Sequence, residues 1–247
     1  MINNFEIKSH DGPGRYGKLK GKNTPIIINP NEFKIAPYEG SAYNIDKEIA
    51  MWNVDETIKK AKSFVNECSI AVIQGSKYFD LRIECAKKLE NIGYNGFIIA
   101  NSDDLLLHPK DLIELIVKLR KTLKPTSYLI FPFAEPSFMP LLAYIGIDGF
   151  FDESAKYYSN INVLLTPTKS YDLSIYPIYE DKDIKEIEEY NKNTIDLVLR
   201  KIRTHMKNKS LRNLVEERSN TTPQNNSALK ILDKNYEKYL LEYTQLY

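Results

Sequence analysis

Apolar and polar positions first predict a polar hairpin and then a buried strand. Within the first 25 residues, two clusters rich in glycine, proline, asparagine and lysine, at 10–14 and 20–23, have the composition of tight turns. A run of three isoleucines between two prolines follows at 24–30. A short apolar run bounded in this way is typical of a buried strand.

From about Val54 the apolar spacing alternates between a helical and a strand-like pattern. Spacings of three to four residues predict helices at 54–66, 78–92, 111–123 and, over a short apolar stretch, 136–145. Continuous apolar runs predict strands at 69–74, 96–100, 127–133, 149–151 and 163–165. Gly93 and Pro125 end two of the helices. Regular alternation of helices with apolar strands indicates a parallel sheet.

The predicted fold class is α/β, a TIM-like (β/α) barrel rather than an open doubly wound sheet. The strands are closely spaced, and no glycine fingerprint of a dinucleotide-binding fold is present. In such barrels the working residues lie at the carboxyl ends of the strands. The segments to examine are therefore Gln74-Gly75-Ser76, Asn101-Ser102-Asp103, Pro132 to Glu135, and Asp152-Glu153-Ser154.

After Asp181 the sequence becomes polar and helical. It predicts a long helix at 183–208, a loop at 220–226 and a tyrosine-rich amphipathic helix at 227–246. We therefore expect two domains, a barrel at 1–180 and a carboxyl-terminal helical segment at 181–247. Four tyrosines at helical spacing either pack against the barrel or, if exposed, mark a docking face: Tyr236, Tyr239, Tyr243 and Tyr247.

Charge is nearly balanced, so any nucleic-acid site has to come from uneven placement of cations. The formal net charge of the 247 residues is +1, and 27% of them are charged. One cluster between 200 and 212 contains no acid and consists of Arg200, Lys201, Arg203, Lys207, Lys209 and Arg212. It either contacts tRNA phosphates or is a solvated helix face, and Lys18, Lys20 and Lys22 form a possible second patch.

The cysteines and histidines predict neither a metal site nor a bound cofactor. Cys68 and Cys85 belong to no C-x-x-C pair and are expected to be buried as small apolar residues. His10 and His108 have no partner at metal-ligand spacing. No apolar stretch is long enough to span a bilayer and no signal segment opens the chain, so a cytoplasmic protein without a membrane partner is expected.

Motifs at several strand ends resemble the archaeal tRNA-guanine transglycosylase family. Residues 72–82 (VIQGSKYFDLR) are similar to the family segment V-x-Q-G-x-x-Y-x-D-L-R, and 93–99 (GYNGFII) to G-F-D-G-Y-A-I. Residues 132–152 resemble a family segment that ends in D-L-F-D-S. The hairpin at 5–30 and the helix at 211–218 also match family elements. The resemblance covers most of the chain and implies a barrel that acts on tRNA.

Departures from the family pattern narrow the resemblance. The chain lacks the Asp-Ser-Gly-Gly-Phe-Gln segment whose Asp contacts the incoming base, the zinc site of three Cys and one His, and the RNA-binding carboxyl-terminal domains. The interval 33–67 is much shorter than its family counterpart, which implies a shortened, incomplete barrel. This combination resembles the amino-terminal, transglycosylase-like part of archaeosine synthase, the alpha subunit in a split form.

That resemblance implies a reaction and partners. The expected activity is lysine addition to 7-cyano-7-deazaguanine in tRNA. The expected partners are tRNA, a separate polypeptide carrying the lysine-transfer and RNA-binding domains, and a radical-SAM enzyme of the same pathway. Two alternatives stay open: a minimal tRNA-guanine transglycosylase that uses an Asp nucleophile, and a non-catalytic scaffold that binds tRNA or stabilises its partner.

Residue roles follow from the same resemblance. Asp152 aligns with the family nucleophile through Phe151-Asp152-x-Ser154, and a carboxylate there can attack the ribose C1′. Asp152 could instead contact substrate or cap a helix. Gln74 and Gly75 are expected to meet the edge of a deazaguanine, unless they form an ordinary turn.

The remaining candidates are weaker. Further substrate contacts are predicted at Ser76, Asn101, Ser102, Phe133 and Glu135. Asp103 and Asp104 either meet the guanidine-like face of the base or a lysine ammonium, or belong to a turn. Glu135 and Glu153 either act as acid or base or are solvated rim charges.

Overall fold

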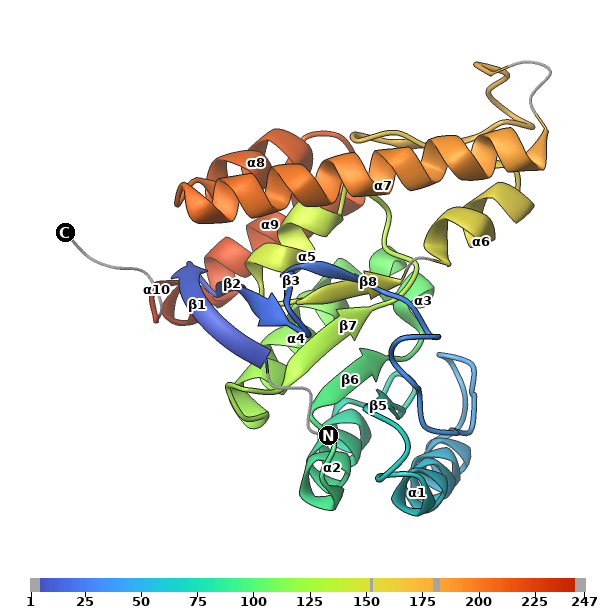
Figure 1. Ribbon diagram of the computed structural model, residues 1–247, viewed down its shortest axis with the longest axis vertical. Coiled ribbons are helices and arrows are strands. Elements are labelled where there is room, and N and C mark those ends of the chain that lie inside the picture. The colour runs from blue at the N-terminus through green and yellow to red at the C-terminus, as the bar shows by residue number, and fades with distance from the viewer. Residues whose placement is uncertain (1–4, 152, 180–182, 243–247) are drawn as a thin grey trace.

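A five-stranded parallel sheet forms the centre of the protein. The computed structural model describes residues 5–151, 153–179 and 183–242 (Figure 1). The sheet has the order β4-β8-β7-β6-β5. Its strands are β4 (Ile26–Ile28), β5 (Ile70–Ile73), β6 (Gly96–Ile99), β7 (Tyr128–Phe131) and β8 (Gly149–Phe151). The predicted α/β class with a parallel sheet is therefore confirmed.

Helices alternate with these strands, largely as predicted. They are α1 (Lys47–Ser63), α2 (Phe79–Ile92), α3 (Ser102–Leu107), α4 (Pro109–Thr122), α5 (Met139–Tyr144) and α6 (Ser154–Asn160). Gly93 ends α2 with a φ of 124°, a backbone conformation that favours glycine. Two predictions were wrong in detail. No helix was predicted between the strand at 96–100 and the helix at 111–123, where α3 lies, and α1 starts seven residues before the predicted Val54.

The two faces of the sheet have different covers. Side chains of alternate strand residues, such as Ile73, Ile99 and Phe131, pack into a large core with the helices. Their neighbours on the opposite face form a second core cluster with three residues from outside the sheet. Those three are Phe5, Leu19 and Phe33. Except for the partly buried Ile27 of the edge strand β4, the strand residues are buried on both faces, which explains the continuous apolar runs in the sequence.

The edges of the sheet are β4 and β5, and the described residues do not close it into a ring. After β4 the chain crosses to the other edge, where Ile35 forms a single parallel bridge with Ile70 of β5. The short interval between the two edge strands supplies only this bridge, the segment before α1, and α1 itself.

The amino-terminal hairpin packs on the sheet through its apolar residues. It consists of β1 (Phe5–Asp11), β2 (Gly14–Leu19) and β3 (Lys22–Asn23), all antiparallel. Arg15 of β2 and Arg120 of α4 both form ion pairs with the buried carboxylate of Asp148, which directly precedes β8. This ion-pair network ties the hairpin and α4 to the amino end of β8.

The strand predicted at 163–165 does not join the parallel sheet. It forms β9 (Val163–Leu165), which pairs antiparallel with β10 (Ser170–Asp172) in a separate hairpin. The side chain of Asn191, fully buried, accepts a hydrogen bond from Leu165 N at 2.7 Å and donates one to Val163 O at 2.9 Å. The apolar run alone could not reveal that a helix side chain would take up this strand's backbone groups.

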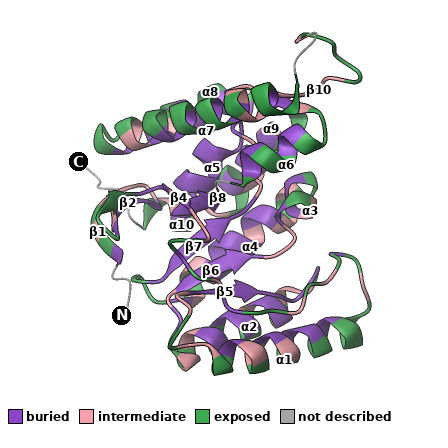
Figure 2. Cartoon of the chain, turned by 45° about the vertical axis from the view of Figure 1, so that its right-hand side comes forward, coloured by how far each residue is buried: buried purple, intermediate pink, exposed green. Residues whose placement is uncertain are grey.

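Four helices complete the described chain: α7 (Ile184–Lys207), α8 (Leu211–Ser219), α9 (Pro223–Asn235) and α10 (Glu237–Leu241). The long α7 has one buried and one exposed face (Figure 2). The predicted loop at 220–226 is shorter than expected, because α9 begins at Pro223, and the predicted single last helix is interrupted at Tyr236.

Of the tyrosine stripe, Tyr239 is buried and donates a hydrogen bond to Ile145 O at 2.8 Å. Tyr243 and Tyr247 lie outside the described residues.

The structure also bears on the cysteines, on membrane-spanning helices and on metal-ligand clusters. Cys85 is buried, whereas Cys68 is only partly buried, so the prediction of two buried cysteines was wrong for Cys68. Both thiols are free. No helix in the described ranges has the length and apolar character to cross a bilayer. Within the same ranges, no three His, Cys, Asp or Glu side chains gather as they would around a metal ion.

Candidate functional site

The carboxyl ends of β5, β6 and β7 carry an unusual number of left-handed backbone conformations. Ser76, Asn101 and Phe133 have φ values of 52°, 56° and 54°, and Gly75 has a φ of 137°. Such conformations are costly for residues other than glycine and concentrate at functional sites. The carboxyl ends of parallel strands lie on the same side of the sheet, which is called the carboxyl edge. The sequence-predicted residues of these loops therefore all lie at the carboxyl edge.

Gly75 is required by close packing as well as by its φ value. A Cβ atom at this position would lie 2.7 Å from the backbone nitrogen of Arg82 and 2.8 Å from its Cγ. The first turn of α2 therefore approaches the Gln74-Gly75-Ser76 loop more closely than a larger residue would allow. The loop and the helix behind it are thus held together as one unit.

Arg82 is the buried centre of this unit. Its guanidinium donates to Ser76 O at 2.6 Å, to Ala100 O at 2.9 Å and to the Oδ1 of Asn101 at 3.1 Å. The side chain has no solvent exposure, and burial lowers its pKa to about 10. One cation thereby joins the loops after β5 and β6. Sequence reasoning gave it no role, although it ends the family segment at 72–82.

A segment before α1 crosses over these loops; residues 37–46 are called the strap. Ser41 is its main contact. The Ser41 hydroxyl lies 3.4 Å from Gln74 Oε1 and 3.1 Å from Ser76 Oγ, and its carbonyl accepts a hydrogen bond from Asn101 Nδ2 at 2.8 Å. Gln74 is consequently only 1% exposed. The sequence gave no sign of this cover, because nothing in it pairs Ser41 with residues more than thirty positions away.

The strap is held at a second point. Tyr43 donates a hydrogen bond to Asp111 of α4 at 2.7 Å and stacks on His108, with ring centroids 5.2 Å apart. Burial and the neighbouring Asp111 carboxylate raise the pKa of Tyr43. His108, considered only as a metal ligand from the sequence, packs against this ring instead.

Ser102 adds an unsatisfied group at the end of β6. It is 1% exposed, and within the described ranges its buried hydroxyl has no hydrogen-bond partner. A buried polar atom in this state is a place for an ordered water or a ligand group. We call Ser41, Gln74, Ser76, Arg82, Asn101 and Ser102 the polar half of the edge.

Aromatic rings dominate the ends of β7 and β8. Phe133 lies edge-on to Phe151, with centroids 6.4 Å apart, and its ring is 4.7 Å from that of Tyr157. Tyr158 donates a hydrogen bond to Phe133 O at 2.8 Å and contacts Tyr157 edge-on. We call these four residues the aromatic half. Of these four, the sequence predicted only Phe133 as a substrate contact, because α6, which carries both tyrosines, was not predicted.

The acidic candidates have separate surroundings. Glu135 accepts a hydrogen bond from the Ser170 hydroxyl of β10 at 2.7 Å, so it links the loop after β7 to the β9–β10 hairpin. Glu153 is exposed and occupies the N-cap position of α6. Asp103 and Asp104 lie in the first helical turn of α3 and not in a turn between elements. Burial, together with the nearby Asp103 charge, raises the pKa of Asp104. Asp152, the candidate nucleophile, lies outside the described residues.

Most of the predicted tRNA-binding cations are engaged within the chain. Arg212 forms a two-point ion pair with Asp233, at 2.6 and 2.8 Å, and also contacts Glu216. Arg203 donates to Pro25 O at 2.9 Å, and Lys209 donates to His10 O. The others with contacts are Arg200, paired with Asp196, and Lys207, over the Tyr16 ring. Lys201 is exposed. Contact of this cluster with tRNA stays a prediction.

Two lysines of the possible second basic patch, Lys20 and Lys22, are engaged as well. Lys22 pairs with Glu32, and Lys20 donates to Glu32 O while lying over the Phe33 ring. These contacts fasten the hairpin to the segment after β4.

Comparison with known proteins supports the resemblance carried by the motifs. The chain is 30% identical to the archaeosine synthase of Methanocaldococcus jannaschii over 143 residues, which is 58% of this chain and 22% of that protein. It is 22% identical to the archaeosine synthase subunit alpha of Thermococcus kodakarensis, over 98% of this chain and 43% of the relative. The tRNA-guanine(15) transglycosylase of Pyrococcus furiosus is 26% identical over 93% of this chain and 44% of the relative. The chain is a homologue of archaeosine synthases and archaeal tRNA-guanine transglycosylases.

Two further facts concern the extent of this similarity. No protein-family model matches the chain. The chain spans less than half the length of these curated archaeosine synthases and transglycosylases.

Proposed function

We propose that this chain acts in tRNA modification in archaeosine biosynthesis, as the transglycosylase-like subunit of an archaeosine synthase. The reaction would be lysine addition to 7-cyano-7-deazaguanine already placed in tRNA, carried out with a partner polypeptide. The observation that carries the proposal is the homology, together with the position of the family segment at 72–82, which begins at the carboxyl end of β5.

The chemistry of that edge suits a planar heterocycle. Amide and hydroxyl groups of Gln74, Asn101 and Ser102 can meet the hydrogen-bonding edge of a deazaguanine. Rings of the aromatic half can pack on its face. The register of the sheet brings the two halves together, because Ile98 of β6 pairs with Ile130 of β7, and Asn101 and Phe133 each follow three residues later.

Base entry on this proposal requires the strap to yield. The hydroxyl of Ser41 occupies the position beside Gln74 Oε1 that a base edge would take. Ser41 itself is held by three polar interactions, which an entering base would have to replace. Asp152 follows Phe151 directly in the chain, and we propose it for substrate contact in this reaction. Attack on C1′ would belong to the alternative of base exchange, because lysine addition breaks no glycosidic bond.

The proposal extends to the architecture and the assembly. We propose that the five-stranded sheet is the remaining part of a (β/α) barrel, at 1–180, with residues 181–247 as a helical domain. The partner polypeptide would carry the lysine-transfer and RNA-binding domains. A radical-SAM enzyme of the same pathway would act on the product.

Incorporation of radiolabelled lysine and radiolabelled guanine into tRNA, with and without the candidate partner, tests this proposal. Lysine incorporation only with the partner present, lost in Gln74→Ala, supports it. Guanine exchange by this chain alone, lost in Asp152→Asn, would instead assign a minimal transglycosylase. Activity of the pair that survives both substitutions would leave the chain as a scaffold. Glu56→Gln on α1 serves as the control variant.

A further inference from the structure

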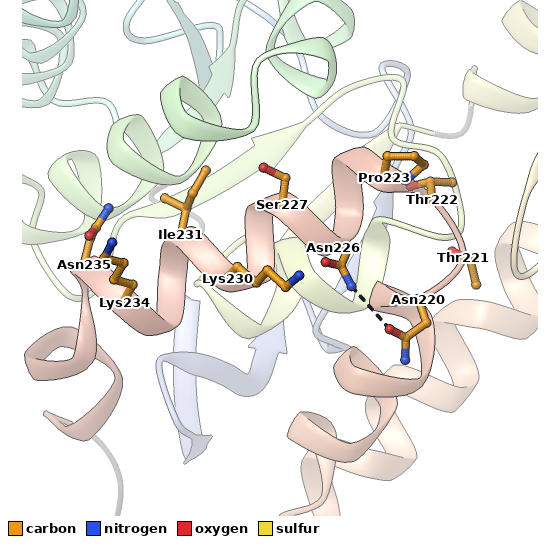
Figure 3. Close-up of a pocket in the computed structure, with 10 residues that line it drawn as sticks. All are labelled: Asn220, Thr221, Thr222, Pro223, Asn226, Ser227, Lys230, Ile231, Lys234 and Asn235. Atoms are coloured by element: carbon orange, nitrogen blue, oxygen red, sulfur yellow. Dashed lines mark hydrogen bonds between the residues drawn. The ribbon is translucent and has the colours of Figure 1, made fainter.

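A groove along α9 is lined without a single carboxylate. It has a volume of about 760 Å³ and runs from the end of α8 to the end of α9 (Figure 3). Its lining residues are Asn220, Thr221, Thr222, Pro223, Asn226, Ser227, Lys230, Ile231, Lys234 and Asn235. Amides, hydroxyls and two ammonium groups line it together with Pro223, Ile231 and the apolar parts of the other side chains, and we call these ten residues the α9 groove.

Lys230 and Lys234 are the cations of this groove. They lie four residues apart on one face of α9, and both are exposed. In the described ranges no carboxylate lies within ion-pair distance of either ammonium group. Asp233, the acidic residue of the same helix, forms an ion pair with Arg212 on another face of the helix. The two charges are therefore available to an anion from outside the chain.

The contrast with the cluster at 200–212 is direct. There, five of six cations are held by carboxylates, carbonyls or a ring of the same chain, as described above. A cation that must first leave an intramolecular partner gains less from a phosphate. The sequence favoured the cluster because its cations are dense, but the structure leaves the sparser pair on α9 unengaged.

The amino-terminal end of α9 is also linked to the loop that follows β7. There, Asn225 donates a hydrogen bond to Ser137 O at 2.8 Å, and Ser137 lies in the loop that follows β7. The same end carries the first turn of α9, where the helix dipole favours anions, although Pro223 has no N–H and Asn225 N is already bonded to Thr222 Oγ1.

We propose that the α9 groove binds the phosphodiester backbone of an RNA, namely the tRNA whose base enters the carboxyl edge of the sheet. The proposal rests on the proposed function for the identity of that RNA. Lys230 and Lys234 each neutralise a phosphate, and the amides and hydroxyls of the groove bond to phosphate and ribose oxygens. Such contacts position the RNA without reading its sequence.

Fluorescence anisotropy with a labelled tRNA transcript, titrated over a range of KCl concentrations, tests the proposal with the full chain. We expect Lys230→Glu/Lys234→Glu to weaken binding about tenfold or more. The salt slope should fall by roughly 1 to 2, because two phosphate contacts are lost. A neutral pair, Lys230→Gln/Lys234→Gln, should fall between this variant and the wild type. An unchanged melting midpoint shows that each variant is folded.

Two matched pairs give the controls. Lys62→Glu/Lys87→Glu, on α1 and α2, removes the same charge elsewhere and should leave binding within about twofold of the wild type. Arg200→Glu/Lys201→Glu tests the competing location on α7. Equal losses from the α1/α2 pair, or loss only from the α7 pair, would overturn the inference and leave the proposed function standing.

Two other outcomes also decide the matter. If the α9 variant binds tRNA normally but loses its partner polypeptide in a pull-down, the groove is a protein interface and the inference is wrong. If the wild-type chain binds no tRNA, alone or with its partner, both the inference and the proposed function fail.

Discussion

At the ends of β5 and β6 the chain is held by hydrogen bonds, whereas at the ends of β7 and β8 it is held by rings. Arg82 joins two loops of the polar half through three acceptors, and Ser41 covers them. In the aromatic half, Phe133 keeps its left-handed conformation among Phe151, Tyr157 and Tyr158. The comparison teaches that one wall of the edge offers directional hydrogen bonds and the other offers a cluster of aromatic rings.

Replacing the buried arginine should give the largest effect. Arg82→Met leaves the acceptors Ser76 O, Ala100 O and Asn101 Oδ1 without their donor, and each unsatisfied buried group costs about 1–3 kcal/mol. We expect the free energy of unfolding to fall by about 3 kcal/mol, measured by urea denaturation. Arg82→Lys, which keeps the charge but fewer donors, should fall in between. An unchanged urea midpoint would show that the polar half does not depend on this side chain.

The next effect concerns activity rather than stability. Gln74→Leu keeps the size of the side chain but removes its amide, so a base edge would lose its partner. A loss of about tenfold or more in kcat/KM for tRNA is expected, since a site built for hydrogen bonds is sensitive to their removal. Ser41→Ala, which only loosens the strap, should keep or raise kcat/KM. Equal losses in both variants would mean that Gln74 serves the strap and not the substrate.

A smaller loss is expected in the aromatic half. Tyr158→Phe removes the hydrogen bond to Phe133 O and should lower the free energy of unfolding by about 1 kcal/mol. Thermal unfolding followed by circular dichroism measures it. Tyr157→Phe, whose hydroxyl makes no contact described above, is the matched control. If both variants behave alike, ring packing alone holds Phe133.

The smallest effect is a pH dependence in α3. Burial and Asp103 raise the pKa of Asp104, so its charged form opposes folding. The stability that the protonated form contributes is present below the unfolded value of 3.8 and is lost as the pH rises through the folded pKa. Asp104→Asn should therefore be more stable than the wild type at pH 7, and the difference should vanish below pH 3.8. A difference that persists in acid would point to packing instead of charge.

Several expectations from the sequence failed for identifiable reasons. The start of α1 was missed because Ile49, Met51 and Trp52 are about half exposed, and so they obscure the amphipathic pattern. The tyrosines of α6 were not recognised as a cover for Phe133, because a helix of seven residues offers too few periodic positions. The cation cluster at 200–212 looked available because its partners, such as Asp233 and Pro25, are distant in sequence or lie outside the cluster.

By itself the sequence determined the parallel sheet, the order of its main strands and helices, and the homology carried by the segment at 72–82. These are local properties, since apolar periodicity and motif spacing are written in consecutive residues. Only the tertiary structure decided that Ser41 covers Gln74, that Arg82 joins two loops, and that Lys230 and Lys234 face a groove without acids. Such contacts join residues far apart in the chain, and a hydrogen bond or an ion pair depends on which groups folding brings within about 3 Å of each other.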